Sequence, residues 1–412
     1  MGADHEILRS LLDAAIAAAE PAGKFDGRLP ARPKGRTIVV GAGKAASSMA
    51  GAFEAAWGPC EGLVVTRYGH RTPTRFIEVV EAAHPVPDEA GRAAADRILA
   101  LAEAAGPDDL VVCLMSGGAS ALLTRPAPGI SLAAKQAITR DLLRSGAPIG
   151  AMNMIRKSLS SIKGGRLAAA AAPARLVTYL ISDVPGDDPA LIGSGPTMPD
   201  LSDFEDVLRL LRHYRIAVAP ELIEAMRANA LAQPPLAGET YMLATPKMSL
   251  DAAARQALAL GITPMILGDA IEGEAREVGT VMAGIARSIV THGVPARAPC
   301  VLLSGGETTV TLVGTGRGGR NTEFLLSLLV GTAGLPGIAA IACDTDGIDG
   351  VEDNAGAWIG PGSRAAADEL SLDLKARLAD NDSHAVFAAL GTLVHTGPTF
   401  TNVNDFRAVL IR

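Results

Sequence analysis

A lysine stands inside a glycine-rich turn near the start of the 412-residue chain, where it could meet an anion. Lys44 follows Gly41 and Gly43, directly after a β-branched run at 36–40. A strand that ends in glycines and leads into a helix turns backbone N–H groups toward the positive end of the helix dipole, which favours an anion. The segment is not a Walker A loop, because Ala45 replaces the Ser or Thr that would hold magnesium. A tight strand–helix turn without a ligand is the alternative, and the lysine favours binding.

A second cationic segment, 314–328, carries two arginines among glycines. Arg317 and Arg320 keep their charge at any physiological pH and suit a bidentate grip on phosphate. Asn321 or Thr322 can cap the helix that follows. The segment therefore predicts a flexible phosphate-binding loop that opens into a helix.

Two Ser-Gly-Gly loops follow apolar strands. Ser116, Gly117 and Gly118 offer a hydroxyl and free N–H groups to a carboxylate or phosphate, although simple helix capping by the serine explains them equally well. The similar phrase at 304–307 indicates related loop chemistry. It adds three predicted nucleotide-binding residues, Gly305, Gly306 and Glu307.

A predicted helix over 153–168 has a divided surface. One face is apolar, and the opposite face carries polar and basic side chains: Asn153, Arg156, Lys157, Ser160 and Lys163. A solvated basic face is the ordinary explanation. Because this is the densest basic cluster in a chain of net charge −7, a helix that faces an anion is the alternative, with Lys157 as a phosphate-binding residue.

Acidic residues follow two other strands. Asp183 and Asp187 lie in segment 182–189, and Asp344 and Asp346 lie in segment 342–350. An α/β sheet places its ligands at the carboxyl ends of its strands, and magnesium needs only one or two carboxylates beside phosphates and waters. These four residues are therefore predicted metal ligands, with turn-forming aspartates as the alternative.

The elements that must position these residues begin with short apolar strands separated by helical segments. The expected strands lie at 36–40, 63–65, 76–80, 109–115 and 175–181. Strands without polar alternation indicate a parallel sheet covered on both faces. The first half of the chain is therefore predicted to be a Rossmann-like, doubly wound α/β domain.

The length of the chain exceeds one ordinary core, so two domains are expected. Segment 228–239, with adjacent prolines and no periodicity, predicts a boundary between domains at 1–235 and 236–412. In the second half, segment 301–314 predicts two strands joined by a glycine turn. That pattern indicates an α+β domain with a mixed sheet.

Composition excludes several classes of protein. A net charge of −7 and 3% aromatic residues argue against nucleic-acid binding. The four cysteines are scattered, which fits reduced thiols in a cytoplasmic protein. The most apolar stretch, 167–181, is interrupted by Pro173 and Arg175, so no membrane span is expected.

The motifs together resemble the glycerate 2-kinase family, whose C-terminal half is called the MOFRL domain. The resemblance covers nearly the whole chain and rests on GAGKAA, AAHPVPD, LMSGGASALL, NMIRKSLSSIKGGRLA, ISDVPGDDP with IGSGPT, LSGGETTVT, GRGGRNTE, DTDGIDG and TGPTFTNVND. It implies phosphorylation of D-glycerate at the 2-hydroxyl by ATP and Mg²⁺ or another divalent cation, in a cleft between the two domains of a monomer or homodimer. It also implies active-site roles for Lys44 and Arg320. We expect these two residues to bracket the reacting groups, and Asp183 or Asp187 to hold magnesium or orient the 2-hydroxyl.

Two rival functions stay open. An NAD(P)H-dependent hydroxypyruvate reductase would use the Gly41-x-Gly43-x-x-Ala46 pattern, but the acid expected after the second strand is replaced by Thr66-Arg67. A nucleotide-binding protein without catalysis would bind ATP and not turn it over with D-glycerate.

Overall fold

The computed structural model describes residues 2–200, 202–230, 238–333 and 335–412, which divide into two compact units. The Rossmann-type unit comprises Pro21–Ser182 and Asp187–Leu243, and the mixed-sheet unit comprises Met1–Glu20, Asp183–Gly186 and Ala244–Arg412. The boundary predicted at residue 235 lies in 231–237, outside the described residues. The sequence did not reveal that the N-terminal helix belongs to the second of these units.

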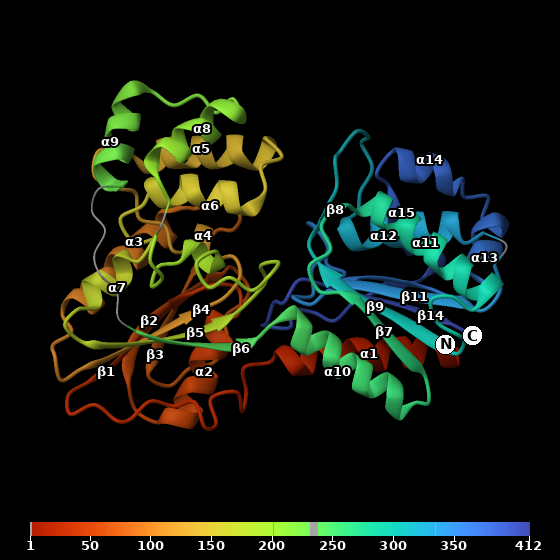
Figure 1. Cartoon of the computed structure of the whole chain (residues 1–412), viewed down its shortest axis with the longest axis horizontal. Helices are drawn as coiled ribbons and strands as arrows, with labels where there is room; N and C mark the ends of the chain where they lie inside the picture. Colours follow the sequence, from red (N-terminus) through yellow and green to blue (C-terminus); the bar gives the residue numbers. More distant parts are fainter. Residues whose placement is uncertain (1, 201, 231–237, 334) are drawn as a thin grey trace. The chain divides into compact units, whose positions relative to one another are not determined.

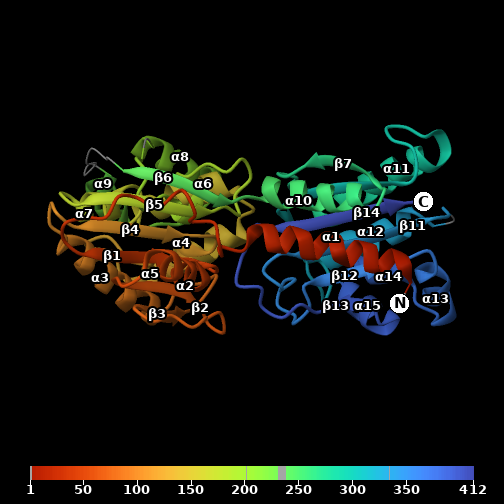
Figure 2. The ribbon, with the colours of Figure 1, turned by 90° about the horizontal axis from the view of Figure 1, so that it is seen from below.

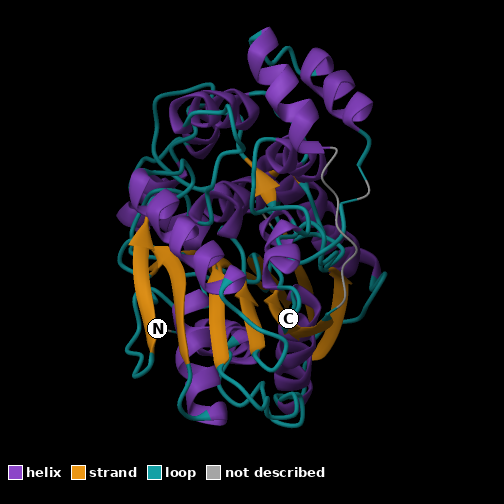
Figure 3. Cartoon of the chain, turned by 90° about the vertical axis from the view of Figure 1, so that its left-hand side faces the viewer, coloured by secondary structure: helices purple, strands orange, loops and turns teal. Residues whose placement is uncertain are grey.

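The Rossmann-type unit is built on a six-stranded sheet in the order β3-β2-β1-β4-β5-β6 (Figure 1). Its strands are β1 (Thr37–Ala42), β2 (Glu61–Arg67), β3 (Ile77–Ala82), β4 (Leu110–Met115), β5 (Arg175–Ile181) and β6 (Glu239–Ala244). The first five pair in parallel and lie side by side in Figure 3. Every residue of β4 is buried, as expected for a sheet covered on both faces. The predicted doubly wound α/β fold is confirmed.

Helices pack around this sheet, and some of them pack mainly against one another. They are α2 (Ala46–Trp57), α3 (Glu89–Glu103), α4 (Ala119–Leu122), α5 (Leu132–Arg144), α6 (Ile149–Ser158), α7 (Arg166–Ala171), η1 (Ile192–Ser194), α8 (Phe204–His213) and α9 (Pro220–Ala230). Side chains of α5, α6, α8 and α9 share one apolar cluster, which includes Ile138, Ile155 and Phe204.

The single helix predicted over 153–168 is wrong. The helix α6 ends at Ser158, and α7 begins only at Arg166. Gly164 and Gly165 between them have φ values of 57° and 79°, which a right-handed helix cannot contain. The basic residues of this segment therefore lie on different elements.

The mixed-sheet unit contains a six-stranded sheet in the order β13-β12-β11-β14-β9-β7. The strands are β7 (Thr263–Gly268), β9 (Cys300–Gly306), β11 (Ile338–Asp344), β12 (Gly356–Ile359), β13 (Leu393–Val394) and β14 (Asp405–Ile411). The strand β7 pairs in parallel with β9, and the other pairs are antiparallel. The predicted mixed sheet is confirmed.

The hairpin predicted over 301–314 is wrong. Both edges of β9 are occupied, by β14 and β7, so the segment that follows cannot fold back onto it. It forms instead β10 (Thr308–Thr309), which pairs with β8 (Gly273–Glu274).

Helices cover the two faces of the mixed sheet. They are α1 (Ala3–Ala19), α10 (Pro246–Ala259), α11 (Ala275–His292), α12 (Arg320–Gly331), α13 (Ser363–Glu369), α14 (Leu374–Ala379) and α15 (Ser383–Leu390). The helix α1 packs against α10, β11 and β14 (Figure 2). Alternate residues of β9 face opposite ways, with Val301 in the α1–α10 core and Leu302 in the α11–α12 core. Within the described part of the chain, no helix combines the length and apolar character needed to cross a membrane.

Candidate active site

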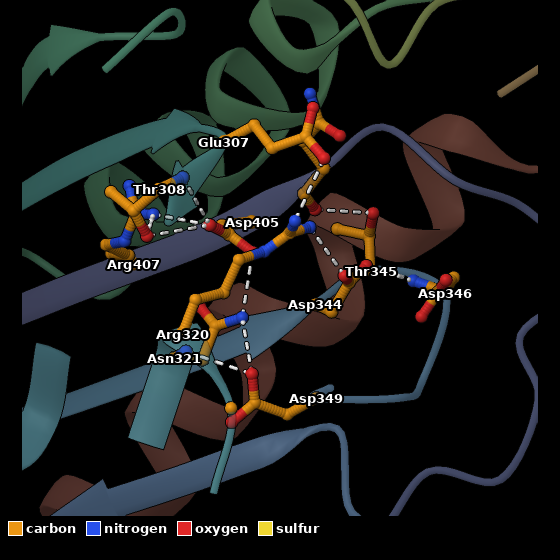
Figure 4. Close-up of polar contacts among 12 residues, drawn as sticks. Glu307, Thr308, Arg320, Asn321, Asp344, Thr345, Asp346, Asp349, Asp405 and Arg407 are labelled. Atoms are coloured by element: carbon orange, nitrogen blue, oxygen red, sulfur yellow. Dashed lines mark hydrogen bonds and ion pairs between the residues drawn. The ribbon is translucent and has the colours of Figure 1, made fainter. Parts of the chain in front are cut away.

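Arg320 lies at the edge of the mixed sheet where β9 and β11 end and β14 begins (Figure 4). Its Nε donates to Asp405 Oδ1 at 2.7 Å, its Nη1 to Glu307 Oε1 at 3.0 Å, and its Nη2 to Asp344 Oδ2 at 2.8 Å. Asp405 is opposite Asp344 on one side and Gly306 on the other in the strand register. One guanidinium therefore joins the ends of three strands.

The carboxylates around Arg320 carry more charge than it neutralises. Burial opposes the charge on the guanidinium, but Asp405, Asp344 and Glu307 together raise the pKa of Arg320 well above its usual value. Arg407 also pairs with Asp405, which leaves two arginines facing three carboxylates. The side chains of Asp405 and Asp344 are nearly inaccessible, whereas that of Glu307 is 42% exposed. These ion pairs therefore fix Arg320 at the edge of the mixed sheet.

Asp349 fixes the start of α12 behind Arg320. Its two carboxylate oxygens each accept a backbone N–H at 2.9 Å, from Asn321 and from Thr322. Burial raises the pKa of Asp349, although these donors oppose that rise. Asn321, predicted to bind nucleotide, is fully buried, and its Nδ2 donates to Asp405 Oδ1 at 2.8 Å. In this arrangement Asn321 positions the carboxylates.

Asp183 belongs to the same unit as the Asp344–Asp346 turn. Its Oδ2 accepts from Asn402 Nδ2 at 2.9 Å, and its backbone carbonyl accepts from the side chain of Asn404. The carbonyl of Asn404 accepts in turn from the N–H of Thr345 at 3.1 Å. The C-terminal loop therefore ties Asp183 to the turn after β11.

The four predicted metal ligands are divided between the units. Asp183, Asp344 and Asp346 lie in the mixed-sheet unit, whereas Asp187 lies in the Rossmann-type unit. The described residues contain no group of three or more His, Cys, Asp or Glu side chains arranged to hold a metal alone. The metal site therefore stays a prediction.

Three other predicted residues of the mixed-sheet unit have structural partners. Arg317 binds Glu352 through Nε at 2.9 Å, with its side chain 68% exposed. Gly305 and Gly306 pair with β14, and a Cβ at Gly306 would lie 2.3 Å from backbone atoms of Ile271. Close packing thus explains the glycine at 306. Nucleotide binding by these three residues stays a prediction.

In the Rossmann-type unit, the turn after β1 is joined to the turn after β4. The N–H of Gly43 donates to Val65 O at 3.0 Å, that of Lys44 to Gly117 O at 2.8 Å, and that of Ala45 to Ser116 Oγ at 3.0 Å. These donors are engaged by the protein itself, and Gly41 lies within the sheet pairing. Gly43 has φ 135°, and a Cβ there would meet Ser116 Oγ at 2.1 Å. The structure thus leaves less room than predicted for a backbone phosphate cradle.

Lys44 lies beside a histidine that the sequence did not single out as a site residue. A Cβ at Gly118 would approach Lys44 Cγ at 3.2 Å and His84 Nε2 at 3.2 Å, so both side chains border this glycine. The strand order reverses between β1 and β4, and ligands of such sheets bind at this point. The AAHPVPD motif was the available signal for His84.

Lys157 is not part of a solvated basic face. Its Nζ lies 3.5 Å from Asp200 Oδ1, and both side chains are over 90% buried. This ion pair gives Lys157 a structural partner, and its predicted contact with phosphate stays a prediction.

The fold and these residues define a two-unit α/β protein with a Rossmann-type sheet, a mixed sheet and charged loops at strand ends. Residues 7–227 match a family described as "Domain of unknown function (DUF4147)", and residues 300–405 match the MOFRL family. The chain belongs to the glycerate 2-kinase family.

Proteins named as glycerate kinases and proteins named as hydroxypyruvate reductases both match almost the whole chain. The D-glycerate 2-kinase of Thermotoga maritima is 38% identical over 93% of this chain and 92% of its own length. A protein of Agrobacterium vitis with the provisional name of a hydroxypyruvate reductase is 53% identical over 99% of this chain and 94% of its own. The crystal structure of Thermotoga maritima glycerate kinase matches with a TM-score of 0.88 at 36% identity, over 99% of both chains.

Proposed function

We propose that this protein transfers the γ-phosphoryl group of ATP to the 2-hydroxyl of D-glycerate, giving 2-phospho-D-glycerate and ADP. The observation that carries this proposal is the position of Lys44 beside His84 at the switch point of the Rossmann-type sheet. The relatives named glycerate 2-kinases support the same reaction.

Phosphoryl transfer asks a protein mainly to position two anions and to neutralise charge on the moving group. Lys44 supplies a compact positive charge next to an imidazole. We assign Arg320 a second task beside its predicted contact with the reactants, because its three nitrogens donate to three carboxylates. It holds those carboxylates in place for a cation, rather than gripping phosphate alone.

Magnesium fits the residues of the mixed-sheet unit. Asp183, Asp344 and Asp346 offer only hard oxygen donors, and Asp344 and Asp346 are almost completely buried. Because magnesium keeps waters and shares substrate phosphates, two such carboxylates suffice. Two of these carboxylates would hold the ion together with waters and substrate phosphates, and the ion would neutralise phosphate charge when bound. Asp183 alternatively orients the 2-hydroxyl.

The test is ³¹P NMR of the product formed from ATP, MgCl₂ and D-glycerate. A 2-phosphoglycerate signal that grows as the ATP signal declines is the expected result. A 3-phosphoglycerate signal, or ADP formed without phosphorylated glycerate, would contradict the proposal.

Reduction of hydroxypyruvate is the second candidate, because the Agrobacterium vitis relative carries that name. A dinucleotide needs backbone N–H groups for its pyrophosphate, and those of Gly43, Lys44 and Ala45 are engaged by the protein. The structure thus favours the kinase. Loss of NADPH absorbance with hydroxypyruvate, at a rate matching the kinase assay, would reverse this preference.

A further inference from the structure

Three cationic side chains from three segments gather inside the Rossmann-type unit. Lys135 lies on α5, Arg156 on α6, and Lys163 in the turn between α6 and α7. Lys135 is 2% exposed and Lys163 is fully buried, while Arg156 is partly exposed. Their charges act on one another, since Arg156 disfavours the charge of Lys135, and both disfavour that of Lys163. We call these three residues the cation cluster.

The cation cluster has no carboxylate partner among the described residues. Lys135 Nζ is buried without a hydrogen-bond acceptor, and Lys163 Nζ donates to the carbonyl of Leu123 at 2.8 Å. The nearby Asp200 pairs with Lys157 instead. Burying an uncompensated charge costs several kcal/mol, so proteins normally pair such groups or leave them neutral.

Burial has a large effect on protonation here. It lowers the pKa of Lys135 to about 7 and that of Arg156 to about 10, and it lowers the pKa of Lys163 well below its usual value. In each lysine the neighbouring cations add to this effect. A bound anion would reverse both causes, because it supplies the missing opposite charge and hydrogen-bond acceptors.

The short helix α4 links the cation cluster to Lys44. Gly118, before α4, borders Lys44, and Leu123, directly after α4, accepts the hydrogen bond from Lys163. Ser120 on α4 contacts Ser194 at 2.8 Å, which donates to Asn153 on the same helix as Arg156. Since α4 has four residues, about 6 Å of helix separates its two ends.

We infer that Lys135, Arg156 and Lys163 form a binding site for a small oxyanion, a carboxylate or phosphate group, next to the Lys44 turn. The inference rests on the proposed function, because the reactants of that function supply the oxyanion. It is either the carboxylate of the hydroxy acid or a phosphate of the nucleotide. Arg156 is the member of the cation cluster that is partly exposed.

Isothermal titration calorimetry on the full chain tests this site with three probes: D-glycerate, ADP and inorganic phosphate. Lys135→Met keeps an unbranched side chain as far as Cε and removes the amine. We expect this variant to bind at least one probe tenfold or more weakly than wild type, a loss of about 1.4 kcal/mol in binding free energy. Weaker binding of D-glycerate alone would identify the substrate carboxylate as the ligand of the site. Weaker binding of ADP and inorganic phosphate alone would identify a phosphate group. Arg140→Met, an exposed position on the same helix, is the matched control and should bind as wild type does.

Proton uptake provides a readout that a structural role would not move. At pH 8, binding of an anion should draw up to about one proton onto Lys135, seen as a dependence of the binding enthalpy on the buffer. Lys135→Met should lose this uptake, and Arg140→Met should keep it.

The inference is overturned if a folded Lys135→Met binds all three probes within twofold of wild type, or if wild type binds none of them. Should that variant not fold, Arg156→Gln is judged by the same criteria. Failure of the kinase proposal would look different. If no 2-phosphoglycerate forms but Lys135→Met still binds a probe tenfold more weakly than wild type, the proposed reaction is wrong and the oxyanion site stands.

Discussion

The two charged regions of this molecule, the carboxylates around Arg320 and the cation cluster, differ in how their buried charged groups are paired. At the edge of the mixed sheet, three carboxylates of the fold surround Arg320. In the Rossmann-type unit, the described residues place no carboxylate against Lys135, Arg156 or Lys163. A buried basic group either pairs with an acid or anion or gives up its charge. The first region therefore positions groups, and the second is built to take its partner from a ligand.

The largest expected effect comes from breaking the first region. Asp405→Ala leaves Arg320 and Arg407 without their shared carboxylate, which we expect to lower the free energy of unfolding by about 3–5 kcal/mol. Urea denaturation measures this loss. Asp353→Ala removes an aspartate whose side chain is 90% exposed, and should change stability by less than about 0.5 kcal/mol. Equal losses in both variants would show that the carboxylates around Arg320 have no special role.

The variant Arg320→Ala tests whether Arg320 contacts the substrate or positions the carboxylates around it. The family resemblance implies an active-site role for Arg320, and the structure adds that Asp344 and Asp405 would face each other with less positive charge in this variant. We expect kcat to fall by about 10²–10³-fold and thermal stability to fall with it. Steady-state kinetics and thermal unfolding of one preparation measure both. A loss of kcat with wild-type stability would favour direct contact with substrate over positioning.

The second region makes a prediction about pH. The folded-state pKa of Lys135, about 7, is below its usual value of 10.5, so above pH 7 the unfolded chain holds a proton that the folded chain lacks. Stability without ligand should therefore rise with pH, by about 2 kcal/mol more in wild type than in Lys135→Met between pH 7 and 9. Parallel urea titrations at the two pH values measure the difference. Identical pH slopes would mean that Lys135 is not the buried amine described here.

The smallest effect is expected at the exposed partner of Arg320. Glu307→Gln removes a carboxylate that is 42% exposed and leaves Asp344 and Asp405 in place. Exposed ion pairs contribute about 0–1 kcal/mol, so its unfolding free energy should stay within that range of wild type. A loss as large as that of Asp405→Ala would place Glu307 among the essential partners.

The sequence predicted the parallel sheet well, because β4 and β5 are short apolar runs between helices. It predicted Arg320, Glu307 and Asp344 as site residues, but not Asp405 or the contacts that join them. Asp405 lies 85 residues further along the chain and reaches Arg320 only through the register of β14 between β9 and β11, which no local pattern encodes. Lys135 was missed for a related reason. A lysine in a largely polar helix looks solvated until the packing of α5 against its neighbours is known.

In the proposed reaction, Lys44 supplies the positive charge that meets the reactants at the switch point between β1 and β4. This role is tested most directly by kcat of Lys44→Ala with ATP, magnesium and D-glycerate, beside its thermal unfolding. We expect a kcat about 10²–10³-fold below that of wild type, with an unchanged unfolding temperature. Turnover near the wild-type value in the folded variant would contradict it.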